Sequence, residues 1–185
     1  MKRVFIAIKI YPDSSFKSII QELNIRLEKE KIRWVNPHNL HLTLRFLGET
    51  KTEVISHISE ELLKLASETK SFTITLKGVG VFRSVSYPRV LWVGIDKNED
   101  LQKLKKKVDN SLQNVGFAIE RKNFIPHLTV GRMKKINDRD NLRKLIQDYG
   151  GNKLQVQHAE SMVLYESKLT ESGPEYLPLK EYFFL

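Results

Sequence analysis

The sequence of 185 residues contains no cysteine and no long apolar segment. Without cysteine, disulfides, thiolate nucleophiles and cysteine-ligated zinc or iron–sulfur sites are excluded. No segment approaches the roughly 20 apolar residues of a membrane span, so we expect no membrane partner. The apolar run near the start is short and Lys9 interrupts it, which favours a first strand over a signal peptide and predicts a cytoplasmic protein.

Other absences narrow the chemistry. No glycine-rich phosphate loop of the Walker type is present, which argues against ATP-driven reactions. His38 follows Pro37 in a loop near residue 41, where it could line a cleft, although a solvated loop histidine is the favoured interpretation. His57 and His158 are assigned no role, and the absence of Asp or Glu at ligand-like spacing argues against a zinc site. We expect no metal and no cofactor. There is no Ser/Gly linker or low-complexity stretch, so residues 1–185 are interpreted as one domain.

Positive charge is in excess. The chain has 31 Lys and Arg against 22 Asp and Glu, a net charge of +9. Such an excess favours a polyanionic partner, a nucleic acid or a nucleotide, although many small basic proteins have no such partner. The run of Lys103, Lys105, Lys106 and Lys107 is interpreted as a solvated helix face outside any site.

The spacing of apolar residues predicts an α+β protein in which strands and helices mix without a regular βαβ alternation. We expect strands near residues 3–10, 39–47, 72–82, 89–95, 117–121, 127–133, 153–158 and 161–166. We expect helices that start near 12–15, at a capping box over 50–53, at Asp96 or Asn98, and near 139.

One short motif occurs twice. His41-Leu42-Thr43-Leu44 returns as His127-Leu128-Thr129-Val130, and each copy lies on a predicted strand that follows a helix. Only two copies are present, so we infer two similar half-units rather than a solenoid. Residues i and i+2 of a strand share a face, which puts each histidine beside its threonine; strict alternation puts Leu42, Leu44 and Phe46 on the opposite face, in the core.

Two such pairs facing each other across a cleft would suit phosphodiester hydrolysis. Histidine has an ordinary pKa near ~6.5, so one imidazole can take a proton from water while another, protonated, gives one to the leaving oxygen. The hydroxyls of Thr43 and Thr129 can donate to non-bridging phosphate oxygens. A single copy of the motif would more often be an ordinary structural histidine, and the residues alone do not decide which histidine is the acid.

These motifs resemble those of the 2H phosphoesterase superfamily, and more narrowly its RNA 2′,3′-cyclic phosphodiesterase branch, also called the 2′-5′ RNA ligase family. The resemblance extends over nearly the whole chain. It is carried by residues 3–7, 41–48, 78–82, 88–92, 124–132, 164–167 and 173–176.

The resemblance implies a two-lobed α+β fold with pseudo-symmetric halves, antiparallel sheets and flanking helices around a central cleft. It implies metal-independent hydrolysis of a terminal 2′,3′-cyclic phosphate to a 2′-phosphate. His41 would be the general acid that protonates the departing 3′-oxygen, and His127 the general base that activates water. The expected partners are RNA or oligonucleotide ends and small cyclic nucleotides, bound by a monomer.

Two arginines are further candidates for phosphate binding. Strict alternation from His41 puts Arg45 on the cleft face, where it could bind phosphate bidentately; the alternative is a solvated arginine. Alternation points Arg132 away from the cleft, but Gly131 is a candidate for a bulge that re-aims it. The family resemblance implies that an arginine at this offset contacts the phosphate.

Two aromatic residues lie next to arginines between predicted strands. Phe82 and Tyr87 could stack a base, or they could be a core residue and a turn residue.

Two other functions compete with hydrolysis. A binding module could hold an RNA end in the same cleft without turnover, although binding alone needs no two titratable groups. A ligase could form 2′-5′ bonds by the reverse reaction, but no nucleotide-activating lysine motif is visible, so hydrolysis is expected to dominate.

Overall fold

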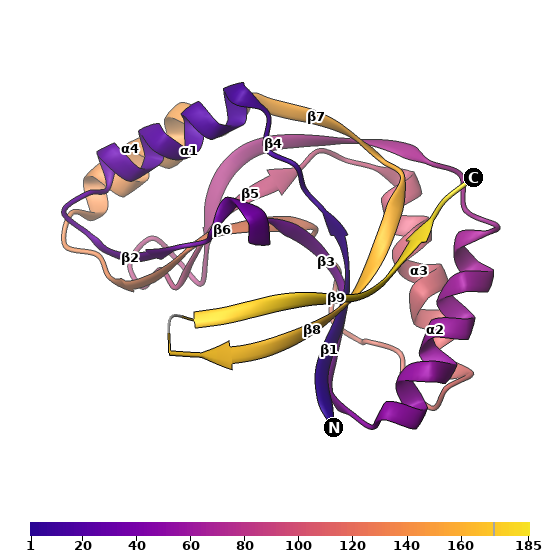
Figure 1. The fold of residues 1–185 in the computed structure, drawn as a ribbon. Coiled ribbons are helices and arrows are strands. Elements are labelled where there is room, and N and C mark those ends of the chain that lie inside the picture. Colours follow the sequence, from indigo (N-terminus) through magenta and orange to yellow (C-terminus); the bar gives the residue numbers. More distant parts are fainter. Residues whose placement is uncertain (172) are drawn as a thin grey trace.

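The computed structural model describes residues 1–171 and 173–185. These residues form nine strands, four α-helices and one 3-10 helix, η1 (Figure 1). The strands are β1 Lys2–Lys9, β2 Lys31–Trp34, β3 His41–Thr50, β4 Phe72–Phe82, β5 Val90–Ile95, β6 His127–Lys135, β7 Lys153–Ala159, β8 Ser161–Thr170 and β9 Gly173–Phe183. The helices are α1 Ser14–Arg26, η1 Pro37–Asn39, α2 Thr52–Ala66, α3 Glu99–Gln113 and α4 Arg139–Tyr149.

All strands belong to one curled antiparallel sheet. Its order is β7-β4-β5-β6-β3-β1-β8-β9, and β2 pairs with β6 beside this path. One lobe therefore holds β4 to β7 with β2, and the other holds β1, β3, β8 and β9. The lobes meet where β3 pairs with β6 through Leu42 and Leu128. The predicted α+β fold is confirmed, with the two lobes sharing a continuous sheet.

The helices lie in two pairs at opposite ends of the sheet (Figure 1). Arg26 of α1 forms an ion pair of 2.8 Å with Asp148 of α4. At the other end, Asn114 after α3 donates a hydrogen bond of 2.8 Å to Glu61 of α2. Leucines on the inner faces of all four helices are buried, so the helices close the apolar core. No helix among residues 1–171 and 173–185 is long and apolar enough to cross a membrane.

The helix starts follow local capping chemistry, with one exception. The Asp13 side chain accepts from the Phe16 N–H, and Asn98 rather than Asp96 caps α3. The predicted capping box at Thr50 is wrong. Thr50 ends β3, and its hydroxyl donates to the Gly48 carbonyl; α2 follows Lys51, which makes no side-chain cap.

The predicted strand at residues 117–121 is also wrong. This segment is a loop after α3, and it packs by specific polar contacts rather than by a strand ladder: the Ala118 carbonyl accepts from Arg45, and Glu120 pairs with Lys105. The interpretation of the lysine run as a solvated face fails for Lys105, which is buried, because α3 turns it toward those acidic partners.

Candidate active site

Both His-x-Thr motifs lie on neighbouring strands at the junction of the lobes. His41 and Thr43 are on β3, and His127 and Thr129 are on β6. All four side chains line one pocket of about 330 Å³. The remaining lining residues are Arg33, Trp34, Val35, Asn36, Asn39, Phe46, Phe82, Val90, Arg132, Gly173, Pro174 and Tyr176. The fold thus brings together two pairs that lie far apart in the sequence.

A bulge in β3 changes which side chains face the pocket. Ala7 of β1 pairs with Thr43, but the preceding residue, Ile6, pairs with Arg45, so Leu44 is extra in the ladder. Phe46 consequently shares the face of Thr43 and lines the pocket, with 62% of its surface exposed. The predictions that Phe46 lies in the core and that Arg45 faces the cleft are wrong, because strict alternation stops at this bulge.

The second strand has the same irregularity. Leu91 of β5 pairs with Gly131 and Trp92 pairs with Thr129, so Val130 is the extra residue. Arg132 is therefore re-aimed and lines the pocket. Gly131 fits this place because a Cβ there would lie 2.8 Å from the Ile32 side chain.

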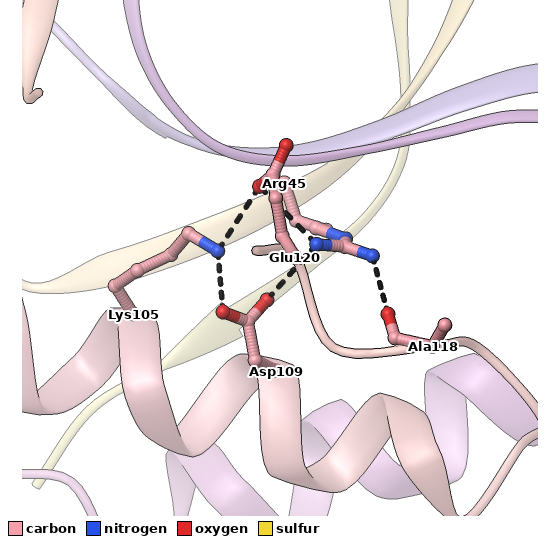
Figure 2. Close-up of polar contacts among 5 residues, drawn as sticks. All are labelled: Arg45, Lys105, Asp109, Ala118 and Glu120. Carbon is pink, nitrogen blue, oxygen red and sulfur yellow. Dashed lines mark hydrogen bonds and ion pairs between the residues drawn. The ribbon is translucent and has the colours of Figure 1, made fainter. Parts of the chain in front are cut away.

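Arg45 instead belongs to a cluster of charges beneath the sheet (Figure 2). Its Nη2 donates to the Ala118 carbonyl at 2.7 Å, and its Nη1 lies 3.2 Å from Glu120 and 3.5 Å from Asp109. Lys105 Nζ bridges the same two carboxylates, at 2.5 Å from Asp109 and 3.3 Å from Glu120. The cluster ties the strand of His41 to α3 and to the loop that precedes β6.

The two imidazole rings are held in the same way. His41 Nδ1 lies 2.6 Å from the Asn39 carbonyl, and His127 Nδ1 lies 2.8 Å from the Ile125 carbonyl. A carbonyl only accepts, so Nδ1 carries the proton in both rings. In the neutral rings Nε2 is then the unprotonated nitrogen, which is the form that a general base requires.

Burial shapes the acid–base properties of both rings. Burial is the largest cause of the lowered pKa of His41. The hydrogen bond to Asn39 raises this pKa, and the positive charges of Arg132 and His127 lower it further. Burial also lowers the pKa of His127, opposed by the hydrogen bond to Ile125. The neutral form of each histidine is therefore favoured near pH 7.

Aromatic rings fix the imidazoles from the side. The Tyr176 ring meets His41 edge-on at 5.0 Å, and the Phe82 ring meets His127 edge-on at 4.5 Å. Tyr87 lies in a turn outside the pocket, with the guanidinium of Arg139 5.8 Å from its ring. Of the two aromatic candidates, only Phe82 is at the site.

Several residues that line the pocket are not predicted from the sequence. Tyr176 and Pro174 belong to β9, a strand that the sequence pattern does not predict. Arg33 carries no local signal, and only the pairing of β2 with β6 brings it to the pocket. Asn39 contributes through its backbone carbonyl, which no side-chain pattern can indicate.

The remaining histidines lie elsewhere. His38 lines a smaller neighbouring pocket, while His57 on α2 and His158 on β7 are exposed. Within the part of the chain that the structure describes, no group of three His, Asp or Glu side chains could hold a metal ion.

Comparisons with known proteins agree with this geometry. The family model described as LigT-like phosphoesterase matches twice, at residues 10–92 and 93–176, so each half contains one His-x-Thr strand. An RNA 2′,3′-cyclic phosphodiesterase of Thermotoga maritima is 38% identical over 97% of this chain and 94% of its own length. One of Methanocaldococcus jannaschii is 35% identical over 97% and 99%.

Solved structures share the fold. A protein of Thermus thermophilus superposes with a TM-score of 0.81 at 24% identity, covering 98% of this chain and 97% of that one. E. coli LigT, solved in complex with 3′-AMP, superposes with a TM-score of 0.77 at 25% identity, covering 99% and 98%.

Proposed function

Because this chain belongs to the LigT-like phosphoesterase family of the 2H superfamily, we propose that it hydrolyses the terminal 2′,3′-cyclic phosphate of RNA to a 2′-phosphate. One observation carries the proposal: two histidines from different halves of the chain line one pocket, each with Nδ1 on a backbone carbonyl. Binding alone would need no such pair, so the binding-module alternative has no observation in its favour.

The proposed reaction uses the histidines in opposite protonation states. His127 takes a proton from water as the water oxygen attacks phosphorus. The bond from phosphorus to the 3′-oxygen breaks, and His41 gives its proton to that oxygen, leaving a 2′-phosphate. The assignment of acid and base follows the family resemblance. A bound anionic substrate favours the protonated ring and so opposes the lowering of the His41 pKa by burial.

Developing negative charge would be met by neutral donors and one cation. Thr43 and Thr129 lie on the pocket wall beside the histidines and would donate to the non-bridging oxygens. Arg132, brought to the same wall by the bulge, would contact the phosphate. With these groups and an imidazolium present, the reaction as proposed needs no metal ion. The reverse 2′-5′ ligation would use the same groups and remain weak, since water is the abundant nucleophile.

We also infer the catalytic domain, the substrates, the oligomeric state and the cellular compartment of this activity. One sheet contains strands of both halves, which supports a single catalytic domain over residues 1–185. The 3′-AMP complex of E. coli LigT supports nucleotide binding by this chain. The enzyme is inferred to act as a monomer in the cytoplasm on RNA or oligonucleotide ends and small cyclic nucleotides.

Product analysis tests the proposal. A short RNA ending in a 2′,3′-cyclic phosphate is incubated with the protein in a chelator, and the ends are identified by mass and by phosphatase sensitivity. A 2′-phosphate is expected. An unchanged end would favour a binding module, and a 3′-phosphate would mean that the leaving oxygen, and so the orientation of the substrate, is wrong.

A further inference from the structure

A second arginine faces the pocket beside Arg132. The antiparallel pairing of β2 with β6 places Arg33 directly opposite Arg132, and both side chains line the pocket. Residues directly opposite in such a pair have Cβ atoms about 5 Å apart, and like charges there are destabilising. The next residues of the ladder, Ile32 and Met133, point to the other face, toward the core. The site therefore places two cations side by side on one wall.

The two arginines lie at different distances from the catalytic histidines. Arg132 is on the strand of His127, and its charge contributes to the lowered pKa of His41. Arg33 is on β2, one strand further out, and its side chain is exposed at the pocket rim. A cyclic phosphate carries one negative charge, which Arg132 alone matches. A second guanidinium at the rim suits a second anionic group on the same substrate.

The Arg33 side chain lies close to Gly173. A Cβ on Gly173 would lie 2.1 Å from Arg33 Nη2, and Gly173 has a φ of +129°, which side-chain-bearing residues rarely adopt. The guanidinium therefore lies against the backbone at the start of β9, the strand that also supplies Pro174 and Tyr176 to the pocket. Glycine at this place leaves room for the guanidinium.

We propose that Arg33 binds the phosphodiester that precedes the terminal cyclic phosphate, so that the site selects RNA ends over cyclic mononucleotides. This proposal rests on the proposed function. The bound group is an internal phosphate that does not react, so its contact is the same in the ground and transition states. It should lower KM for an oligonucleotide without changing kcat.

The test compares two substrates with the same reacting nucleotide: 2′,3′-cyclic AMP and the dinucleotide ApA ending in a 2′,3′-cyclic phosphate. For Arg33→Ala we expect kcat/KM with the dinucleotide to fall by roughly 10-fold or more, as for loss of a charged hydrogen bond, mainly through KM. The value with the mononucleotide should stay within about twofold. Lys31→Ala removes one charge from the same strand outside the pocket and is the matched control.

A neutral linkage sharpens the test. With a methylphosphonate in place of the internal phosphodiester, wild type should lose as much as Arg33→Ala loses, and the variant should lose nothing more. The dependence of log(kcat/KM) on log[salt] should also become shallower by about one for the variant on the dinucleotide.

Failure of the two proposals can be told apart. If wild type opens neither substrate, the proposed function is overturned. If wild type opens both, and Arg33→Ala slows both equally or neither, only the role of Arg33 is overturned. Arg33→Lys, which keeps the charge but not the planar fork, is expected to lie between wild type and Arg33→Ala.

Discussion

Phe46 and Arg132 occupy equivalent positions in the two His-x-Thr strands: each lies five residues after its histidine, follows a bulge, and faces the pocket. The two halves thus repeat a backbone irregularity as well as a motif. The side chains at the repeated position differ, an aromatic ring in one half and a guanidinium in the other. A symmetric frame therefore presents an apolar wall on one side and a charged wall on the other.

Phe46 should act on substrate and not on stability. Phe46→Ala is expected to lower kcat/KM by about 10-fold or more, because an aromatic ring that stacks on a base contributes about 1–3 kcal/mol. The unfolding free energy should change by less than about 1 kcal/mol, since most of the ring is exposed. Leu169→Ala, at an exposed leucine outside the pocket, is the control. A loss of stability without a change in kcat/KM would contradict this.

Each histidine should be needed for turnover. His41→Ala and His127→Ala are each expected to lower kcat by about 10²–10⁴-fold with the fold intact, as judged by circular dichroism. His57→Ala, at an exposed histidine of α2, should behave as wild type. Retention of full activity in both pocket variants would remove the general acid–base mechanism.

The pH dependence follows from the lowered pKa of both rings. For the free enzyme, kcat/KM should be bell-shaped, with a maximum on the acid side of ~6.5, because both apparent pKa values lie below the ordinary histidine value. Bound anionic substrate stabilises the imidazolium, so the alkaline limb of kcat should lie at higher pH than that of kcat/KM.

Substitution of Arg132 tests the pH dependence that follows from the lowered pKa of His41. Its charge lowers the pKa of His41, so Arg132→Met should move the limb of kcat/KM that reports His41 to higher pH, in addition to weakening binding. A maximum of kcat/KM above pH 7 in wild type, or an unmoved limb in the variant, would contradict these expectations.

The charge cluster around Arg45 should matter for stability. Arg45→Ala leaves the largely buried carboxylate of Asp109 and the exposed carboxylate of Glu120 with only Lys105, and we expect the unfolding free energy to fall by about 3 kcal/mol. Arg143→Ala, which breaks an exposed pair with Asp140, should cost less than about 1 kcal/mol. Urea unfolding measures both. An unfolding curve like that of wild type, together with a large rise in KM, would contradict this and indicate that Arg45 binds the phosphate.

The sequence is sufficient for those parts of the fold that depend on local periodicity. Helix starts at Asp13 and Asn98 follow from side-chain caps, and both His-x-Thr strands follow from apolar alternation. The bulge at Leu44 is not predictable because nothing in that residue type marks it, whereas Gly131 indicates its counterpart in β6. The unpredicted bulge at Leu44 places Phe46 on the pocket face of β3 and Arg45 on the opposite face.

Long-range pairing accounts for the other errors. β9 carries Pro174 and Pro178, which disfavour a strand locally, yet it forms the edge of the sheet, where proline is tolerated. Arg33 reaches the pocket only because β2 pairs with a strand about a hundred residues later in the chain. No pattern within either segment contains this information.

The junction between the lobes has a mechanical consequence. The described ladder between β3 and β6 is one residue wide, at Leu42 and Leu128, so neither strand alone sets the spacing of the acid and the base. The spacing therefore depends on the angle between the two lobes. The Arg45 cluster and the helix pairs at both ends of the sheet hold that angle from outside the pocket.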